Sequence, residues 1–346
     1  MRVKSLSVKN GSAVDLPLVV PSFSSKGFHY FKEADTEITR SEASNVLELV
    51  GGFIEEAFLV SAFDVHHEHL ADVTAFFSNT ALILIDSGGY ELNPEFDSSE
   101  PKITPVRNVT FTGEDYAQVL EGLHKENTDF PLLIANFDWG TKGEPFIDQI
   151  KAARTLFKQF PNWSTNFILK PDTSTSGVVH VKKVIPIVNE LKSFDVIGVT
   201  EKELGKGLIE RLRRLAKLRL ALWDNGVTAP IHVWGGMDPL TTPLYYFAGA
   251  DIFDGVSWMR YAYAEGLAVT IDSGPIMRNE ITTPYDQSIA MTRSRNLSTL
   301  QELAVNLQYF ANLAEPEFEI FGARAGELKR TYDVMSAKIS RFEELR

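Results

Sequence analysis

Short apolar runs alternate with longer amphipathic stretches along most of the chain. Eight of these runs end at or beside an acid, a glycine or a hydroxyl side chain: Leu18–Phe23, Phe58–Asp64, Ala81–Gly89, Pro131–Asp138, Asn166–Asp172, Asp195–Thr200, Ile231–Gly236 and Asp251–Ser257. Continuous apolar strands that alternate with helices are typical of a parallel sheet covered on both faces. Eight such units predict an α/β fold, the (β/α)8 TIM barrel, with a doubly wound open sheet as the alternative.

The stretches between the runs predict helices and one insertion. Helix-like sequence is found over Ser41–Leu49, Asp115–His124, Pro145–Phe160, Val179–Lys192 and Leu208–Leu222. The polar segment Asn93–Gly113 contains prolines and predicts a long loop inserted after the third strand. In barrels, loops at the C-terminal ends of strands build the functional site.

The pattern changes after residue 265. Met277–Thr292 is irregular, Leu297–Leu313 is apolar at helical spacing, and Gly326–Arg346 predicts a charged terminal helix. No stretch is rich enough in glycine, serine or proline to separate independent domains. We therefore expect one domain over residues 1–346, with a barrel core at about 15–265 and a helical C-terminal extension at about 266–346.

The amino-acid composition limits the kinds of site and partner that this protein can have. Hydrophobic residues make up 44% of the 346 positions, which is enough for a large core. The formal net charge of −12 means that any contact with nucleic acid must use a local basic patch. The absence of cysteine excludes disulfides, thiolate zinc sites and a cysteine nucleophile. No apolar run reaches the roughly 20 residues that cross a bilayer, so we expect a cytoplasmic protein without membrane contact.

The third apolar run stops abruptly at a carboxylate. Asp86 is followed by Ser87, Gly88, Gly89 and Tyr90. The two glycines remove Cβ atoms where a ligand or a tight turn needs room. A carboxylate, an open backbone and an aromatic ring together suit a planar polar ligand. A strand that ends in an ordinary turn explains the same residues.

Acids recur at the ends of the predicted strands. In a barrel these ends meet at one mouth, so Asp64, Asp86, Asp138, Asp172 and Asp254 are expected to gather there. Gathered carboxylates suit metal binding through oxygen, or acid–base and nucleophilic chemistry at a glycosidic bond. The alternative is that each aspartate caps the helix that follows it.

Two other segments have both a functional and a structural interpretation. Asp64–His69 contains three histidines, but it lacks the H-E-x-x-H spacing, and we interpret it as a polar loop or helix start. The stretch Glu201–Leu222 carries seven cations among its acids. It suits either a phosphate backbone or a solvated helix face.

Six segments at strand ends form an ordered set. They are Val20-Pro21-Ser22-Phe23, Asp86-Ser87-Gly88-Gly89-Tyr90, Asn136-Phe137-Asp138, Val196-Ile197-Gly198-Val199-Thr200-Glu201, Val233-Trp234-Gly235-Gly236-Met237-Asp238-Pro239 and Ala250-Asp251-Ile252-Phe253-Asp254. In this order they resemble the motifs of the tRNA-guanine transglycosylase superfamily, including its D-S-G-G-[FY]-Q and G-x-D-[ML]-F-D signatures. The resemblance covers about residues 15–265.

The resemblance implies a reaction. Members of that superfamily are (β/α)8 barrels that exchange a guanine in transfer RNA, or in DNA, for a free 7-deazaguanine such as preQ0. By position, Asp254 would be the nucleophile that attacks C1′ and forms a covalent glycosyl–enzyme intermediate. Asp86 would be the general acid–base. The chemistry itself needs no cofactor, and the superfamily tends to form dimers.

The resemblance also implies how the base is held. Asp138 would accept hydrogen bonds from the N–H edge of the base. Tyr90 and Trp234 would sandwich the ring, and Gly198 and Gly235 would let the backbone approach it. The target nucleotide would have to be flipped out of its stack.

Departures from the superfamily pattern change these expectations. The glutamine of the first signature is Glu91, and a V-Q-G-G strand end is replaced by Leu169–Asp172, which places the cation of Lys170 near the base. After the nucleophile, Arg260 is the remaining candidate phosphate clamp. The superfamily's C-x-C-x-x-C…H zinc site is absent, so we expect no metal. Its loss disfavours ordinary transfer-RNA docking and favours a divergent member that acts on DNA.

Three alternatives stay open. Water could replace the incoming base, which would make the protein a nucleobase-releasing N-glycosidase. The chain could be a catalytically silent subunit of a modification complex, although Asp86 and Asp254 argue against this. A carboxylate-rich metal hydrolase is the alternative if the resemblance is misleading.

Overall fold

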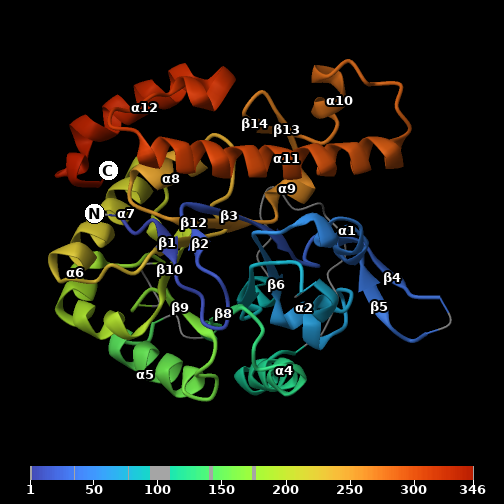
Figure 1. The fold of residues 1–346 in the computed structure, drawn as a ribbon, viewed down its shortest axis with the longest axis horizontal. Coiled ribbons are helices and arrows are strands. Elements are labelled where there is room, and N and C mark those ends of the chain that lie inside the picture. Colours follow the sequence, from blue (N-terminus) through green and yellow to red (C-terminus); the bar gives the residue numbers. More distant parts are fainter. Residues whose placement is uncertain are drawn as a thin grey trace. The chain divides into compact units, whose positions relative to one another are not determined.

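Eight parallel strands close into a barrel, as the sequence predicts (Figure 1). The computed structural model describes residues 2–34, 36–76, 78–93, 110–139, 143–173 and 177–345. The barrel order is β10-β11-β12-β3-β6-β7-β8-β9. The strands are β3 (Leu18–Phe23), β6 (Ala57–Ser61), β7 (Leu82–Asp86), β8 (Leu132–Ala135), β9 (Ser164–Leu169), β10 (Val196–Thr200), β11 (Ile231–Trp234) and β12 (Ile252–Gly255). Each of the eight predicted apolar runs contains or overlaps one of them, because strands covered on both faces are apolar throughout.

Helices follow most of these strands. They are α1 (Glu42–Val50), α2 (Ala62–His66), α3 (Gly89–Leu92), α4 (Gly113–Glu126), α5 (Phe146–Phe157), α6 (Val181–Val184), α7 (Leu208–Asp224), α8 (Thr242–Phe247) and α9 (Ser257–Arg260). Helix α4 starts with a capping box, in which Thr112 and Asp115 each accept from the other's backbone N–H. The expected helix over 179–192 is instead α6 followed by a 3-10 helix, η3 (Ile185–Ser193). Pro186 cannot donate an α-helical hydrogen bond there.

Shorter elements complete the described chain. The remaining strands are β1 (Ser5–Leu6), β2 (Val14–Asp15), β4 (Tyr30–Lys32), β5 (Thr39–Ser41), β13 (Ala262–Ala264) and β14 (Leu267–Val269). The remaining 3-10 helices are η1 (Gly51–Phe53), η2 (Val73–Phe76) and η4 (Glu201–Leu204). The insertion expected at 93–113 lies largely outside the described residues.

The C-terminal extension is helical, as predicted. It comprises α10 (Ser273–Met277), α11 (Tyr285–Asn312), η5 (Glu319–Arg324), α12 (Ala325–Lys338) and η6 (Phe342–Leu345). The expectation that 277–292 is irregular is wrong from Tyr285 onward, where α11 begins. No apolar stripe marks the first half of α11, because Thr292 and Asn296, the residues that it buries before Leu297, are both polar. Asn296 donates to Trp258 O (2.6 Å) and Tyr261 O (2.6 Å) and accepts from Tyr263 N (2.8 Å). The terminal helix ends at Lys338, earlier than expected.

Two compact units divide the chain. Unit 1 contains residues 1–6, 15–21 and 175–346, and unit 2 contains residues 7–14 and 22–174. In unit 1, aromatic rings join α8 to the extension: Phe247 lies 5.0 Å from Phe310 and 5.2 Å from Tyr332, between ring centroids. In unit 2, the Phe160 and Trp163 rings stack with centroids 5.3 Å apart.

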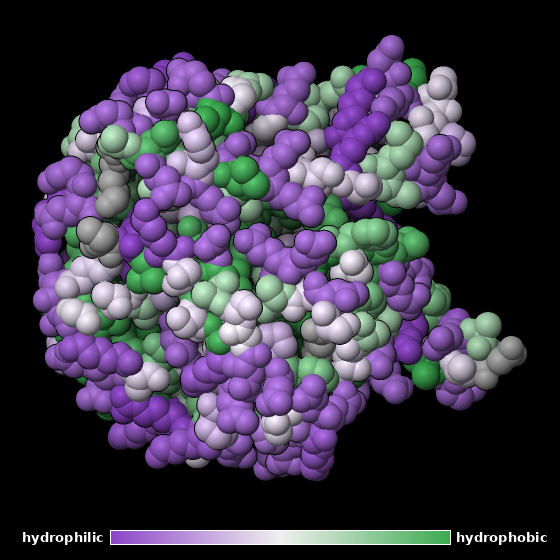
Figure 2. All heavy atoms as spheres, viewed as in Figure 1, coloured by the Kyte–Doolittle hydropathy of each residue, from purple (hydrophilic) through white to green (hydrophobic). Residues whose placement is uncertain are grey.

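None of the described helices is long and apolar enough to cross a membrane. On the face drawn in Figure 2, hydrophilic residues surround scattered hydrophobic ones.

Candidate active site

Asp254 lies at the C-terminal end of β12 in unit 1, and its carboxylate is held in a fixed position. Its Oδ1 is 3.0 Å from His232 Nε2 and accepts a 3.0 Å hydrogen bond from the Gly235 amide. Both partners come from β11 and the turn after it, and β11 pairs directly with β12. Asp254 is 5% exposed and His232 is fully buried. A carboxylate with two fixed partners on one oxygen is oriented before any ligand arrives.

A buried ion pair places the start of β12. Arg219 of α7 contacts Asp251 and donates to the carbonyls of Gly249 (2.8 Å) and Ala229 (2.9 Å). Asp251 also accepts a 2.9 Å hydrogen bond from the Ile231 amide. Because both ions are buried, these bonds tie the chain just before β12, and so the strand that carries Asp254, to α7 and to β11.

Trp234 is the last residue of β11 and lies against the same histidine. Its ring stacks on His232 with centroids 4.2 Å apart and planes 28° from parallel. The side chain is 8% exposed, and its Nε1 is buried without a hydrogen-bond acceptor among the described residues. A buried N–H without an acceptor costs about 1–3 kcal/mol, so it marks a place where a ligand acceptor is favourable.

The turn after β11 leaves room beside Asp254. Gly235 has a φ of +70°, and a Cβ built there would have no atom within 4 Å. Ser257, which begins α9, donates to the Met237 carbonyl at 2.6 Å and fixes the other side of this turn. Gly198 lies on β10 in register with His232, and Arg260 ends α9. The structure therefore places Trp234 and Gly235 on or just after the strand that pairs with β12 and Arg260 on the helix after β12. Gly198 lies one strand further away, on β10.

Unit 2, taken by itself, contains a set of polar groups at the ends of β7, β8 and β9. Asp86 is the last residue of β7 and is partly exposed. Ser87 donates to Asp138 Oδ1, and Lys170 Nζ lies 3.2 Å from Asp138 Oδ2. Asp138 and Lys170 are 11% and 15% exposed, so water screens this ion pair weakly. The carboxylate and the ammonium together offer acceptors and a donor side by side.

Lys170 is aligned through its backbone. Its amide donates to Gln149 Oε1 at 3.1 Å, and its carbonyl accepts from Gln149 Nε2 at 3.1 Å. Gln149 belongs to α5 and is 2% exposed. The amide side chain thus satisfies both backbone groups of the residue that follows β9 and fixes the direction in which Lys170 leaves the strand.

The two glycines after Asp86 have separate structural reasons. Gly88 has a φ of +83°, and a Cβ on it would lie 2.8 Å from the Phe63 Cβ. Gly89 begins α3, and its Cβ would lie 2.8 Å from Asp138 Oδ1. The first glycine therefore permits the left-handed turn, and the second lets the Asp138 carboxylate approach the start of α3.

Tyr90 lies beside a cation. Lys26 Nζ lies 4.4 Å from the centroid of its ring and donates to the carbonyls of Tyr90 (3.1 Å) and Asn93 (2.9 Å). The lysine therefore covers one face of the ring.

Glu91 is half-buried and belongs to a hydroxyl–carboxylate network whose other members are buried. It accepts hydrogen bonds from Ser24 and, at 2.8 Å, from Ser61. Nearby, Asp64 is fully buried and accepts from the Ser25 hydroxyl and from the Ser25 amide at 2.8 Å. Burial, and secondarily the charge of Asp64, raises the pKa of Glu91 to about 7.

The histidine segment extends this network. His69 Nδ1 lies 3.4 Å from Asp64 Oδ1. Burial, followed by the charges of His66 and His69, lowers the pKa of His67 to about 4. Within the described residues, no three His, Asp or Glu side chains are grouped so that they could hold a metal ion.

Sequence reasoning missed two parts of this arrangement. His232 sits inside an apolar strand and has no motif around it, so only the pairing of β11 with β12 connects it to Asp254. The serines that bind Glu91 follow β3 and end β6, and they are likewise inconspicuous in the sequence. The alternation of side chains along paired strands was the signal that could have identified His232.

Comparison with the models of known protein families finds no match for this chain. Comparison with curated proteins also finds none.

Proposed function

We propose that the protein is a base-exchange glycosyltransferase that replaces guanine in a nucleic acid by a 7-deazaguanine. Asp254 attacks C1′ of the target nucleotide, the bond to the guanine base breaks, and an ester between Asp254 and the sugar forms. Asp86 gives a proton to the leaving base. The incoming base then attacks C1′, the Asp254 carboxylate leaves, and Asp86 recovers a proton from the new base.

The observation that carries the proposal is the held carboxylate of Asp254. A nucleophilic aspartate must point one oxygen at a single carbon, and bonds from His232 and Gly235 to Oδ1 restrict its rotation. The same two donors stabilise the carboxylate when it leaves the sugar in the second step. The open space beside Gly235 supplies room next to this carboxylate.

The Asp138–Lys170 pair supports recognition of a guanine-like edge. Guanine and 7-deazaguanines present adjacent N–H donors and a carbonyl acceptor. The Asp138 carboxylate can accept the donors, and the Lys170 ammonium, 3.2 Å away, can donate to the carbonyl. The buried Trp234 N–H near the nucleophile is a further donor for a substrate oxygen.

A trapping assay tests the proposal. Unmodified transfer RNA and guanine-containing duplex DNA are each incubated with the protein, with and without preQ0, and then denatured. We expect a protein–nucleic acid adduct with one of the two polymers, and its loss in Asp254→Ala. An adduct that persists in Asp254→Ala refutes the nucleophile assignment. Absence of any adduct from folded protein favours a silent binding subunit, and base release without preQ0 favours an N-glycosidase.

A further inference from the structure

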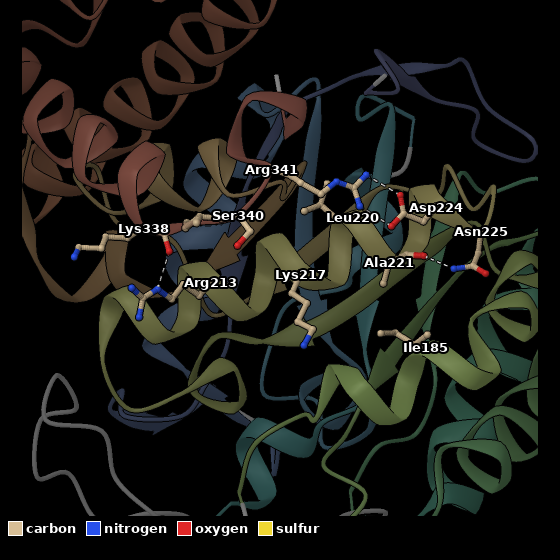
Figure 3. Close-up of a pocket in the computed structure, with 11 residues that line it drawn as sticks. Ile185, Arg213, Lys217, Leu220, Ala221, Asp224, Asn225, Lys338, Ser340 and Arg341 are labelled. Carbon is tan, nitrogen blue, oxygen red and sulfur yellow. Dashed lines mark hydrogen bonds and ion pairs between the residues drawn. The ribbon is translucent and has the colours of Figure 1, made fainter.

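A groove in unit 1 is lined by none of the residues assigned to the candidate active site. It has a volume of about 450 Å³ and is bounded by α7, by the chain just after α12 and by Ile185 at the start of η3 (Figure 3). Its apolar lining includes Leu220, Ala221 and Ile339. Its charged lining is mainly basic: Arg213, Lys217, Lys338 and Arg341 face a single acid, Asp224.

The acid of the groove is already neutralised. Both oxygens of Asp224 are bonded to Arg341, at 2.7 and 2.8 Å, and Arg341 also bonds Glu344 twice, at 2.6 Å each. Figure 3 shows the Arg341–Asp224 contacts at one end of the groove. This ion-pair cluster leaves Asp224 unavailable to the other cations.

The other three cations have no carboxylate partner among the described residues. Arg213 uses its Nε to bond the Lys338 carbonyl at 3.2 Å, which ties α7 to the end of α12 (Figure 3). Lys217 and Lys338 are exposed and make no side-chain ion pair in the described part of the chain. Arg213 and Lys217 stand one helical turn apart, about 6 Å along α7. Three uncompensated cations are therefore concentrated on a protein whose net charge is −12.

We propose that this groove binds the phosphate backbone of a nucleic acid. This inference rests on the proposed function, in which the substrate is a polynucleotide. Phosphates neutralise lysine and arginine without reading sequence, and the groove offers cations but no aromatic side chain for a base. On an acidic protein, such a patch is where a polyanion can approach.

The position of the groove selects a polymer over a mononucleotide. The N-terminal part of α7 is fixed near the C-terminal end of β10, where Arg211 pairs with Glu201 at 2.6 Å. On this helix, which is about 25 Å long, the residues that line the groove run from Arg213 to Asp224, over about 16 Å of the helix axis. A ligand that also reaches Asp254 must therefore extend well beyond one nucleotide. The groove would supply affinity and orientation, while the site at Asp254 would supply chemistry.

The salt dependence of binding tests the inference. Binding of fluorescent transfer RNA, duplex DNA and a single mononucleotide is measured by anisotropy from 50 to 200 mM salt, for wild type and for Arg213→Gln/Lys217→Gln/Lys338→Gln. Between 50 and 200 mM salt, the affinity of wild type should fall by roughly 20- to 40-fold more than that of the variant, because the variant lacks three phosphate contacts. The control is Lys125→Gln/Lys151→Gln/Lys158→Gln, which removes three exposed cations of unit 2 and has the same net charge.

Each outcome bears on one claim. The slope compared is that of the logarithm of the affinity against the logarithm of the salt concentration. A smaller slope in the groove variant and an unchanged slope in the control support the inference. Equal slopes in all three proteins, equal losses in both variants, or no polymer binding by wild type overturn it. Mononucleotide binding with the same slope overturns the polymer assignment. Polymer binding through the groove without an Asp254-dependent adduct refutes the proposed chemistry but leaves the groove assignment intact.

Discussion

Glu91→Gln should change how the stability of this protein depends on pH. In the folded protein, burial beside Asp64 raises the pKa of Glu91 to about 7 from its ordinary 4.5. The folded state therefore holds the proton more tightly than the unfolded state. Stability from this group is fully present below pH 4.5 and is lost as the pH rises toward 7. Glutamine has the same shape but cannot ionise, so the stability of the variant should not fall in this way as the pH rises.

The size of the effect follows from the two pKa values. The difference between a pKa of 4.5 in the unfolded chain and about 7 in the folded protein corresponds to about 3 kcal/mol of unfolding free energy, most of which is lost between pH 5 and pH 8. Relative to Glu91→Gln, wild type should therefore lose about 2–3 kcal/mol of unfolding free energy over that interval. The serine hydroxyls that bind Glu91 can rotate to serve either amide atom of glutamine, so we expect the variant to fold.

Urea unfolding followed by tryptophan fluorescence measures this difference at pH 5 and pH 8. Glu302→Gln is the matched control, because Glu302 is exposed on α11. The control should follow wild type at both pH values. A difference between wild type and Glu91→Gln that stays constant from pH 5 to pH 8 would refute the buried, proton-holding role of Glu91.

Two further predictions concern the groups around the aspartates. His232→Leu removes a donor to Asp254, and adduct formation should slow by roughly 10- to 150-fold, as expected for about 1.5–3 kcal/mol of a charge-assisted bond. His232→Gln, which keeps an N–H donor, should recover part of the rate; equal rates in both variants would exclude a positioning role. Gly89→Ala forces a Cβ to within 2.8 Å of Asp138 Oδ1 and should cost about 1–3 kcal/mol in urea unfolding. Gly122→Ala in α4, where a Cβ meets no atom within 4 Å, should instead stabilise by about 0.5–1 kcal/mol.

The eight barrel strands could be read from the sequence because each is buried on both faces. Such strands form continuous apolar runs, and their neighbours in a parallel sheet follow in regular alternation with helices. The long helix α11 was only half predicted, because its buried face near Asn296 uses a polar side chain to satisfy three backbone groups. Likewise, the helix expected before β10 is mostly 3-10 helix around Pro186.

The sequence by itself determined the barrel, the strand-end positions of Asp86 and Asp254, and the Asp-Ser-Gly-Gly-Tyr turn, since these depend on local pattern. Only the tertiary structure decided which groups meet across strands. His232 reaches Asp254 because β11 pairs with β12, and the serines of two other strand ends enclose Glu91. These partners are far apart in the sequence, and no local periodicity records a contact between them. The strength of these contacts and the raised pKa of Glu91 depend on burial, and burial exists only in the folded chain.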